Sequence, residues 1–209
     1  MKYKIIYADP PWQYANQKNN DPAMGGIVYK TMTIDEIKKL PVNEISDKDS
    51  VLCMWVTMPK LIEGLEVIKA WGFEYRTCLF NWVKVNPNAE IIETEIKGKK
   101  MPDVSIKGGF YSGMGHWVNG NSELCLFAKK GKPKRMSKEV KQLQVHPRQR
   151  HSQKPILHSE IVKLFGDLPR IELFARQNVD GWDCLGNELN GMDIGDSIKN
   201  IINNNQNES

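Results

Sequence analysis

The run Asp9-Pro10-Pro11-Trp12 combines residue types that could do chemistry on an amine. An exocyclic amine such as N6 of adenine is a poor nucleophile, because its lone pair is delocalised into the ring. The Asp9 carboxylate and the Pro10 carbonyl could accept its two hydrogens and direct the lone pair toward an electrophile. Two prolines, Pro10 and Pro11, would fix that geometry at low entropic cost, and Trp12 offers a flat face to a base that has left its stack. A strand-end turn with a core tryptophan is the structural alternative, but the complete tetrapeptide after an apolar strand favours the chemical interpretation.

The motif follows a predicted strand, Lys4–Asp9, which must end at the prolines because they donate no backbone hydrogen bond. In an open α/β sheet, ligands bind beyond the carboxyl ends of the strands, where Asp9 would lie. Thr33 and Glu36 form a capping-box pattern that opens a short helix to Leu40. Further strands are expected at Val51–Val56, Glu74–Lys84, Glu123–Ala128, Arg170–Phe174 and Trp182–Leu185, and helices at Lys60–Trp71 and Pro155–Phe165.

This alternation of strands and helices predicts an α/β fold with a mostly parallel, doubly wound sheet covered on both faces. Residues 1–189 are expected to form a single domain, and the Asn-rich residues 190–209 a disordered tail. Two stretches, Val85–Gly115 and Lys129–Ser152, match no element. Loops of that length are usually functional or disordered.

Charge is distributed unevenly along the chain, which has a formal net charge of +4. The segment Lys97–Lys154 contains 14 Lys or Arg and three Asp or Glu, a balance of +11, whereas the remainder has a balance of −7. A solvated surface is the simplest explanation of a charge run alone. Beside the motif above, the concentration of positive charge indicates a polyanionic partner such as nucleic acid.

Other classes of protein are disfavoured by composition. The four cysteines form no CxxC pair, and the four histidines lack thiols or carboxylates at ligand spacing, so no metal site is expected. No apolar run approaches the ~18 residues of a membrane span, and the run Met1–Ala8 is too short and too β-like for a signal peptide. We therefore expect a cytoplasmic protein without membrane contact.

Beyond these patterns, Ala8–Trp12 resembles the catalytic motif of the MT-A70-like adenine-N6 methyltransferase family. That family comprises the catalytic subunit of the messenger-RNA m6A writer and bacterial and phage DNA-modifying relatives. The resemblance keeps the family's order from residue 5 to residue 190. It continues through Tyr29–Met32, Leu52–Thr57, Gly115–Trp117, Ser152–Pro155, Ile171–Arg176 and Gly186–Glu188.

The resemblance implies a Rossmann-like methyltransferase domain with permuted motif order, in which the catalytic motif precedes the cofactor motif. It implies S-adenosylmethionine as cofactor, with Asp9 at the junction of the cofactor's amine and the target amine. Lys154 would meet the cofactor's carboxylate, Arg176 and Asn178 its ribose, and Asn187 and Glu188 its adenine. The segment around Asn178 is shorter than in the mRNA writer. Glu172, Leu173 and Phe174 would line the same pocket, and Tyr29 resembles a substrate-side residue.

Several functions remain open within and beyond this resemblance. The sequence favours DNA as substrate, because no zinc-finger or RNA-binding module accompanies the domain; an RNA adenosine methyltransferase is the alternative. A non-catalytic scaffold is disfavoured by the intact motif, and another nucleotide cofactor by the lack of GxGxxG and GxxxxGK[ST]. A homodimer is possible. The expected DNA contacts lie in the basic stretches 97–107 and 129–154, at Lys132, Lys134, Arg135, Arg148 and Arg150.

Overall fold

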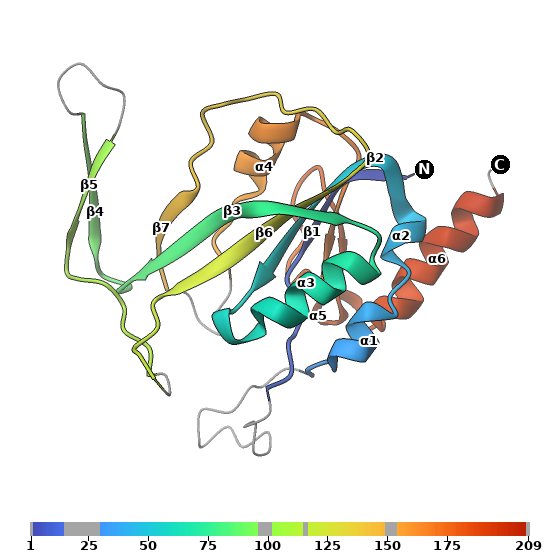
Figure 1. Cartoon of the computed structure of the whole chain (residues 1–209), viewed down its shortest axis with the longest axis horizontal. Helices are drawn as coiled ribbons and strands as arrows, with labels where there is room; N and C mark the ends of the chain where they lie inside the picture. Colours follow the sequence, from blue (N-terminus) through green and yellow to red (C-terminus); the bar gives the residue numbers. More distant parts are fainter. Residues whose placement is uncertain (1, 15–29, 96–101, 115–116, 149–153, 208–209) are drawn as a thin grey trace.

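The computed structural model describes residues 2–14, 30–95, 102–114, 117–148 and 154–207. Within them, seven strands form one sheet in the order β7-β3-β6-β2-β1-β8-β9, and β4 and β5 form a separate hairpin (Figure 1). The strands of the main sheet are β1 (Tyr3–Ala8), β2 (Ser46–Val56), β3 (Glu74–Val85), β6 (Ser122–Lys130), β7 (Leu143–Pro147), β8 (Arg170–Leu173) and β9 (Asp183–Leu185).

Strand direction determines which loops share an edge of this sheet. β1 pairs in parallel with β2 and β8, β8 with β9, and β3 with β7. β6 is antiparallel to both of its neighbours, β2 and β3. The carboxyl ends of β1, β2, β3, β7, β8 and β9 therefore meet at one edge, called here the catalytic edge because Asp9, which the sequence analysis expects to be catalytic, lies there. The segment after β6 leaves at the opposite edge. The expectation of a mostly parallel sheet is confirmed.

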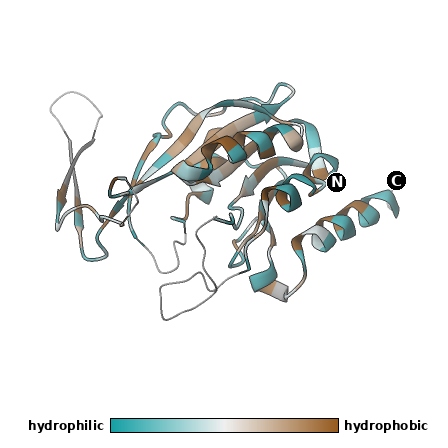
Figure 2. Ribbon diagram, turned by 60° about the horizontal axis from the view of Figure 1, so that its bottom comes forward, coloured by the Kyte–Doolittle hydropathy of each residue, from teal (hydrophilic) through white to brown (hydrophobic). Residues whose placement is uncertain are grey.

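Helices cover both faces, as expected for a doubly wound sheet. Alternating residues of β1 point to opposite sides, so Ile6 and Ala8 join one hydrophobic cluster and Ile5 and Tyr7 the other. The first face is covered by α1 (Ile34–Lys38), α2 (Val42–Ile45), α3 (Leu61–Ala70) and α6 (Ile194–Asn207), and the second by α4 (His158–Phe165). Figure 2 shows the hydrophobic colour gathered on the central strands and on the inner parts of the helices.

Local signals explain several of the helix starts. The Thr33 hydroxyl accepts a hydrogen bond from the Glu36 amide at 3.3 Å, and the Glu36 carboxylate accepts one from the Thr33 amide at 2.7 Å, so the expected capping box is confirmed. The 3₁₀ turn η2 (Met58–Lys60) leads into α3, which covers most of the helix expected at Lys60–Trp71. A four-residue helix, α5 (Asn187–Asn190), follows β9.

Several elements were not expected from the sequence. The stretch Val85–Gly115 contains the hairpin of β4 (Glu90–Glu95) and β5 (Pro102–Lys107), which projects from the sheet at the left of Figure 1. The stretch Lys129–Ser152 contains the edge strand β7. The expectation of a disordered tail at 190–209 is wrong for residues 194–207, because α6 buries Ile194 and Ile198 against the core. Among the described residues, no helix has the length and apolarity needed to cross a membrane.

Candidate active site

Backbone hydrogen bonds hold the Asp9-Pro10-Pro11-Trp12 run at the catalytic edge. The Asp9 amide donates to the Leu173 carbonyl at 3.4 Å, which continues the pairing of β1 with β8 by one residue. Beyond it, the Trp12 amide donates to the Pro10 carbonyl at 2.9 Å. The Met32 amide donates to the Pro11 carbonyl, also at 2.9 Å. The motif is thus a rigid turn whose first side chain, Asp9, leaves the sheet at its edge.

Trp12 lies in a different place from the one expected. Its side chain is only 6% exposed and belongs to the hydrophobic cluster on the α3 face, and its indole Nε1 donates to the Trp55 carbonyl at 3.2 Å. The ring therefore offers no open face to a base in this conformation, and the structural alternative of a core tryptophan describes it correctly. In this position the side chain anchors the turn that carries Asp9 to β2.

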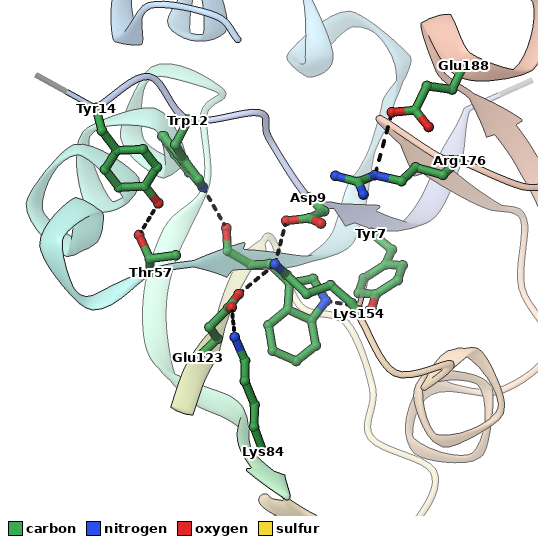
Figure 3. A network of polar contacts seen from close by, with 11 residues as sticks. Tyr7, Asp9, Trp12, Tyr14, Thr57, Lys84, Glu123, Lys154, Arg176 and Glu188 are labelled. Carbon is green, nitrogen blue, oxygen red and sulfur yellow. Dashed lines mark hydrogen bonds and ion pairs between the residues drawn. The ribbon is translucent and has the colours of Figure 1, made fainter. Parts of the chain in front are cut away.

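Beside the turn, Asp9 belongs to a chain of alternating charges (Figure 3). The Lys154 Nζ lies 3.3 Å from an Asp9 carboxylate oxygen and 2.6 Å from a Glu123 carboxylate oxygen. The other oxygen of Glu123 pairs with Lys84 on β3. Glu123 and Lys84 are 6% and 9% exposed, so this network lies beneath the surface, with Asp9 at its outer end. We call these four residues the buried charge network.

Aromatic rings enclose the network. The Lys154 Nζ lies 5.7 Å from the centre of the Trp55 ring, and the Lys84 Nζ 4.7 Å from that of Trp82. The Trp55 indole in turn donates to the Tyr7 hydroxyl at 2.5 Å. Because ring faces attract cations and exclude water, they stabilise two ammonium groups that burial would otherwise penalise.

Burial and neighbouring charge move the pKa values of the network in opposite directions. Burial raises the pKa of the Asp9 carboxyl, and the ammonium of Lys154 opposes that rise without cancelling it. For Glu123, burial would raise the pKa, but Lys154 and Lys84 outweigh it and the pKa is lowered. Burial would lower the pKa of Lys154, yet the carboxylates of Asp9 and Glu123 outweigh it and raise the pKa. The result is a fixed charge pair behind a carboxyl group, Asp9, that accepts protons more readily than usual.

A hollow opens next to Asp9 between the ends of β1 and β8 and the start of α4. It is lined by Tyr7, Asp9, Lys154, Pro155, Ile156, His158, Glu172, Phe174, Arg176 and Gln177. The hollow thus brings Asp9 together with four other residues that were expected to bind the cofactor: Lys154, Glu172, Phe174 and Arg176.

The floor of this hollow shows signs of a built site. Phe174 has a φ of 65° and is the only non-glycine residue with positive φ among the described residues, a conformation that costs energy and is found at functional sites. The His158 Nε2 lies 2.7 Å from the Glu172 carboxylate, whereas its Nδ1 is buried without a hydrogen-bond partner. An orphaned buried polar atom beside a hollow is what a ligand could satisfy.

The remaining residues of the expected cofactor site lie around the hollow rather than in it. The Arg176 Nε is 3.8 Å from the Glu188 carboxylate, so the two segments they come from meet at this edge. Gly186 explains how: a Cβ there would lie 2.0 Å from the Ala175 carbonyl oxygen, so only glycine allows this approach. Asn178 and Asn187 are exposed and Leu173 is buried in the core; none of the three lines the hollow.

The expected DNA contacts fall into two groups. Arg148 follows β7 at the catalytic edge, where its guanidinium carbon lies 4.6 Å from the centre of the Tyr111 ring. The placement of Lys132, Lys134 and Arg135 beside the catalytic face is wrong. They follow β6, which runs antiparallel, and the Lys132 amide accordingly bonds to the Asp49 carboxylate at the opposite edge. Tyr29 and Arg150 lie outside the described residues.

Sequence reasoning missed Glu123 and Lys84 as functional residues. A usable signal was present, since Lys84 directly follows the apolar pair Trp82 and Val83 near the end of β3, and Glu123 precedes the apolar run of β6 near its start. Charged residues are rarely buried without a partner, so two opposite charges in separate strands could have been paired. In the part of the chain that the structure describes, no three His, Cys, Asp or Glu side chains gather in a way that could hold a metal ion.

Comparison with known proteins identifies the family to which these residues belong. The sequence pattern of the MT-A70 family matches residues 3–188, which include the whole sheet and every residue around the hollow. The chain belongs to the MT-A70 family. A match of this extent makes it a member of a family of methyltransferases with a Rossmann-like α/β fold.

Individual members of the MT-A70 family resemble the chain to similar degrees. The type II methyltransferase M.MunI of a Mycoplasma species is 32% identical, over 90% of this chain and 78% of the relative. The human N(6)-adenosine-methyltransferase catalytic subunit METTL3 is 31% identical over 92% of this chain. The MT-A70-like N(6)-adenosine-methyltransferase of Drosophila melanogaster is also 31% identical, over 93%. The chain spans only 29% and 28% of the length of these two animal proteins.

Proposed function

We propose that this protein transfers a methyl group from S-adenosylmethionine to the N6 amine of adenine in DNA. The observation that supports this most directly is the position of Asp9. Its carboxyl group lies at the mouth of a hollow and is held from behind by Lys154, which Glu123 fixes in turn. Membership of the MT-A70 family and the names of the animal relatives as N(6)-adenosine methyltransferases agree with that chemistry.

The residues around the hollow fit the proposed cofactor. S-adenosylmethionine carries an ammonium, a carboxylate, a ribose and an adenine, and when bound it supplies an electrophilic methyl group on a sulfonium. Asp9 could accept from the ammonium, and Lys154 could meet the carboxylate with its remaining hydrogen-bonding capacity. The Arg176–Glu188 pair would hold the ribose and adenine end, and the unpaired Nδ1 of His158 could bond to the ligand.

Asp9 and Pro10 would orient the target amine. The Pro10 carbonyl already accepts the Trp12 amide, but a carbonyl has a second lone pair that can accept a hydrogen of the amine. Asp9 would accept the other hydrogen. Once it received the methyl group that the bound cofactor would supply, the target nitrogen would have to lose a proton. The raised pKa of Asp9 makes this carboxyl group a suitable first acceptor of that proton.

One observation favours DNA over RNA, and a second supports a nucleic-acid substrate of either kind. The chain spans most of the length of the type II methyltransferase M.MunI, unlike that of the animal relatives. The catalytic edge also carries Arg148 stacked on Tyr111, a pair suited to a phosphate or a base. RNA is the second candidate, because METTL3, which is similarly identical, is named an N(6)-adenosine methyltransferase.

One experiment distinguishes these outcomes. The protein is incubated with methyl-labelled S-adenosylmethionine and, in parallel, single-stranded DNA, duplex DNA and RNA pools, and the modified nucleosides are identified by mass spectrometry. N6-methyladenine in DNA is expected, and Asp9→Asn should lose at least ~100-fold in rate while keeping its unfolding midpoint. Label in RNA alone would show that RNA, and not DNA, is the substrate. Full turnover by a folded Asp9→Asn protein would show that Asp9 is not part of the active site.

The cofactor site has a separate test. Arg176→Ala should weaken the binding of S-adenosylhomocysteine in calorimetry by about 1–3 kcal/mol, the range for hydrogen bonds to a charged group. Arg76, an exposed residue on β3 that pairs with Glu74, supplies the control variant Arg76→Ala, which should bind as the wild type does. Equal affinity of all three proteins would show that the hollow is not the cofactor site, and no binding by the wild type would favour a non-catalytic scaffold.

A further inference from the structure

The loop between β5 and β6 exposes more apolar surface than any structural role requires. Phe110, Met114, Trp117 and Val118 are 53%, 99%, 96% and 76% exposed, although they lie within nine residues of one another. We call these four residues the apolar loop. Single exposed apolar side chains are ordinary, but a group of this kind that includes an almost fully exposed tryptophan marks a contact surface.

The apolar loop is fixed to the catalytic edge. The Tyr111 amide donates to the Lys84 carbonyl at 3.0 Å, and the Lys84 amide donates to the Asn121 carbonyl at 2.7 Å. Between these anchors, Gly113 and Gly120 exchange two backbone hydrogen bonds of 2.9 and 3.0 Å. The loop then enters β6, whose second residue, Glu123, contacts Lys154. Figure 1 shows it descending between the β4–β5 hairpin and the start of β6, on the side of the sheet where β1 ends.

The surroundings of the apolar loop indicate its partner. Arg148 is exposed and lies over the ring of Tyr111, next to Phe110 in the chain. No Asp or Glu lies between Lys107 and Ser122 in the sequence, so the loop itself carries no negative charge that would repel a phosphate. Exposed aromatic rings beside a stacked arginine suit unstacked bases with nearby phosphates, whereas a protein partner would more often meet apolar groups without a cation beside them.

We infer that the apolar loop contacts the bases of DNA at the point where the strand is unstacked, with Trp117 as its main stacking side chain. This inference rests on the proposed function and names the form of its substrate. An adenine inside a duplex cannot reach Asp9, so it must leave the stack or come from a single strand. An apolar side chain at the catalytic edge can fill the space that the base leaves or stack on its neighbours.

The test compares three variants in the full chain. Trp117→Ala removes the ring and Trp117→Phe retains one. Met136→Ala removes another exposed apolar side chain, 68% exposed, from the segment that follows β6 at the opposite edge. Fluorescence anisotropy measures the affinity for a labelled 20-nucleotide single strand and for its duplex, each over a range of salt concentrations. Sedimentation equilibrium measures the oligomeric state.

Trp117→Ala should weaken binding to the single strand roughly tenfold, as expected for the loss of one stacked base. Trp117→Phe should recover most of that loss, Met136→Ala should match the wild type, and the salt dependence should not change because no phosphate contact is lost. Wild-type affinity in Trp117→Ala would overturn the inference. So would the loss of a dimer in Trp117→Ala with unchanged DNA affinity, which would make the loop a contact between copies.

These outcomes remain distinct from a failure of the proposed function. If the wild type methylates DNA and Trp117→Ala binds and methylates equally well, only the inference about the apolar loop fails. If the wild type binds the single strand through Trp117 but places label in no nucleic acid, the proposed function fails and the contact surface remains.

Discussion

Glu123 is the residue on which the buried charge network depends. Its two carboxylate oxygens contact two ammonium groups, Lys84 and Lys154, and it is 6% exposed. A buried charge that loses its partner costs far more than the pair itself contributes, because the remaining ion stays out of water without compensation. Removing this one carboxylate leaves two ammonium groups with reduced compensation.

Glu123→Gln should therefore lower the free energy of unfolding by about 3–5 kcal/mol in urea titrations. Glu66→Gln, which breaks the exposed pair of Lys38 and Glu66, is the matched control and should change it by less than ~1 kcal/mol. Because the pKa of Glu123 is lowered on folding, its stabilisation is present above the ordinary glutamate pKa and lost as the pH falls through the folded value. The difference between wild type and variant should shrink in acid, and equal stabilities at neutral pH would contradict the role given to Glu123.

The methyl-transfer rate should fall in acid at a higher pH than an ordinary aspartate would cause, because it depends on the ionisation of Asp9. Burial raises its pKa, with Lys154 opposing, and only the ionised form can take up the proton that the amine loses. The rate at saturating cofactor and DNA should fall as the pH drops through this raised pKa, above the range of an ordinary aspartate. The ¹³C shift of the Asp9 carboxyl, followed across pH, would assign this fall to Asp9. A group that titrates at or below the usual aspartate value would rule out this account.

The sequence anticipated residues that line the hollow better than the residues that support them. Asp9, Lys154 and Arg176 were each expected at one site, and the structure places all three around the hollow. Trp12 was misjudged, because a tryptophan beside a motif can face solvent or the core and only tertiary packing decides which. Glu123 was overlooked because its partner Lys84 is 39 residues away in the sequence and lies on another strand, so that only the fold brings the two together.

Elements with a strong local pattern were predicted well, and those without one were not. β1 is mostly apolar, β2 has a continuous apolar run over its second half from Val51 to Val56, and α1 has its capping box, so these positions follow from short-range chemistry. β7 is a five-residue edge strand without a fully buried side chain, which leaves little pattern to detect. α6 is rich in asparagine, a poor helix former, and is held by tertiary packing of its apolar stripe.

The packing of α6 has a direct test. Ile198 lies on the inner side of α6 and is fully buried. Near the start of the helix, the Ser197 amide and hydroxyl both donate to the Asp193 carbonyl. Ile198→Ala should lower the free energy of unfolding by about 2–5 kcal/mol, the range for a buried isoleucine. Lys199→Ala, on the exposed side of the same helix, should have little effect. An unchanged unfolding curve for Ile198→Ala would restore the expectation of a disordered tail.

For the molecule as a whole, the direction of β6 divides the positive charge between two edges. The strand has nine residues, Ser122–Lys130, and at ~3.3 Å per residue its ends lie roughly 30 Å apart. Glu123 at one end contacts the site of Asp9 through Lys154, while Lys132 at the other end bonds to Asp49. A sequence pattern gives the position of a strand but not its direction, so the charge run looked like one continuous DNA surface.

This division predicts which cations matter for DNA. Neutralising Lys132, Lys134 and Arg135 together should leave the KM for DNA within about twofold of the wild-type value, because DNA engaged at Asp9 does not contact the opposite edge. Attraction between these cations and more distant phosphates is weak, because salt screens it beyond the Debye length of ~8 Å at physiological ionic strength. Arg148→Ala, a single change at the catalytic edge, should raise the KM and reduce the salt dependence by about one phosphate contact. Steady-state methylation at several salt concentrations measures both, and S-adenosylhomocysteine affinity, expected to be equal in all three proteins, controls for the fold. If the triple variant loses DNA binding while Arg148→Ala keeps it, DNA would have to cross the sheet to the far edge, and the catalytic edge would not be the principal DNA surface.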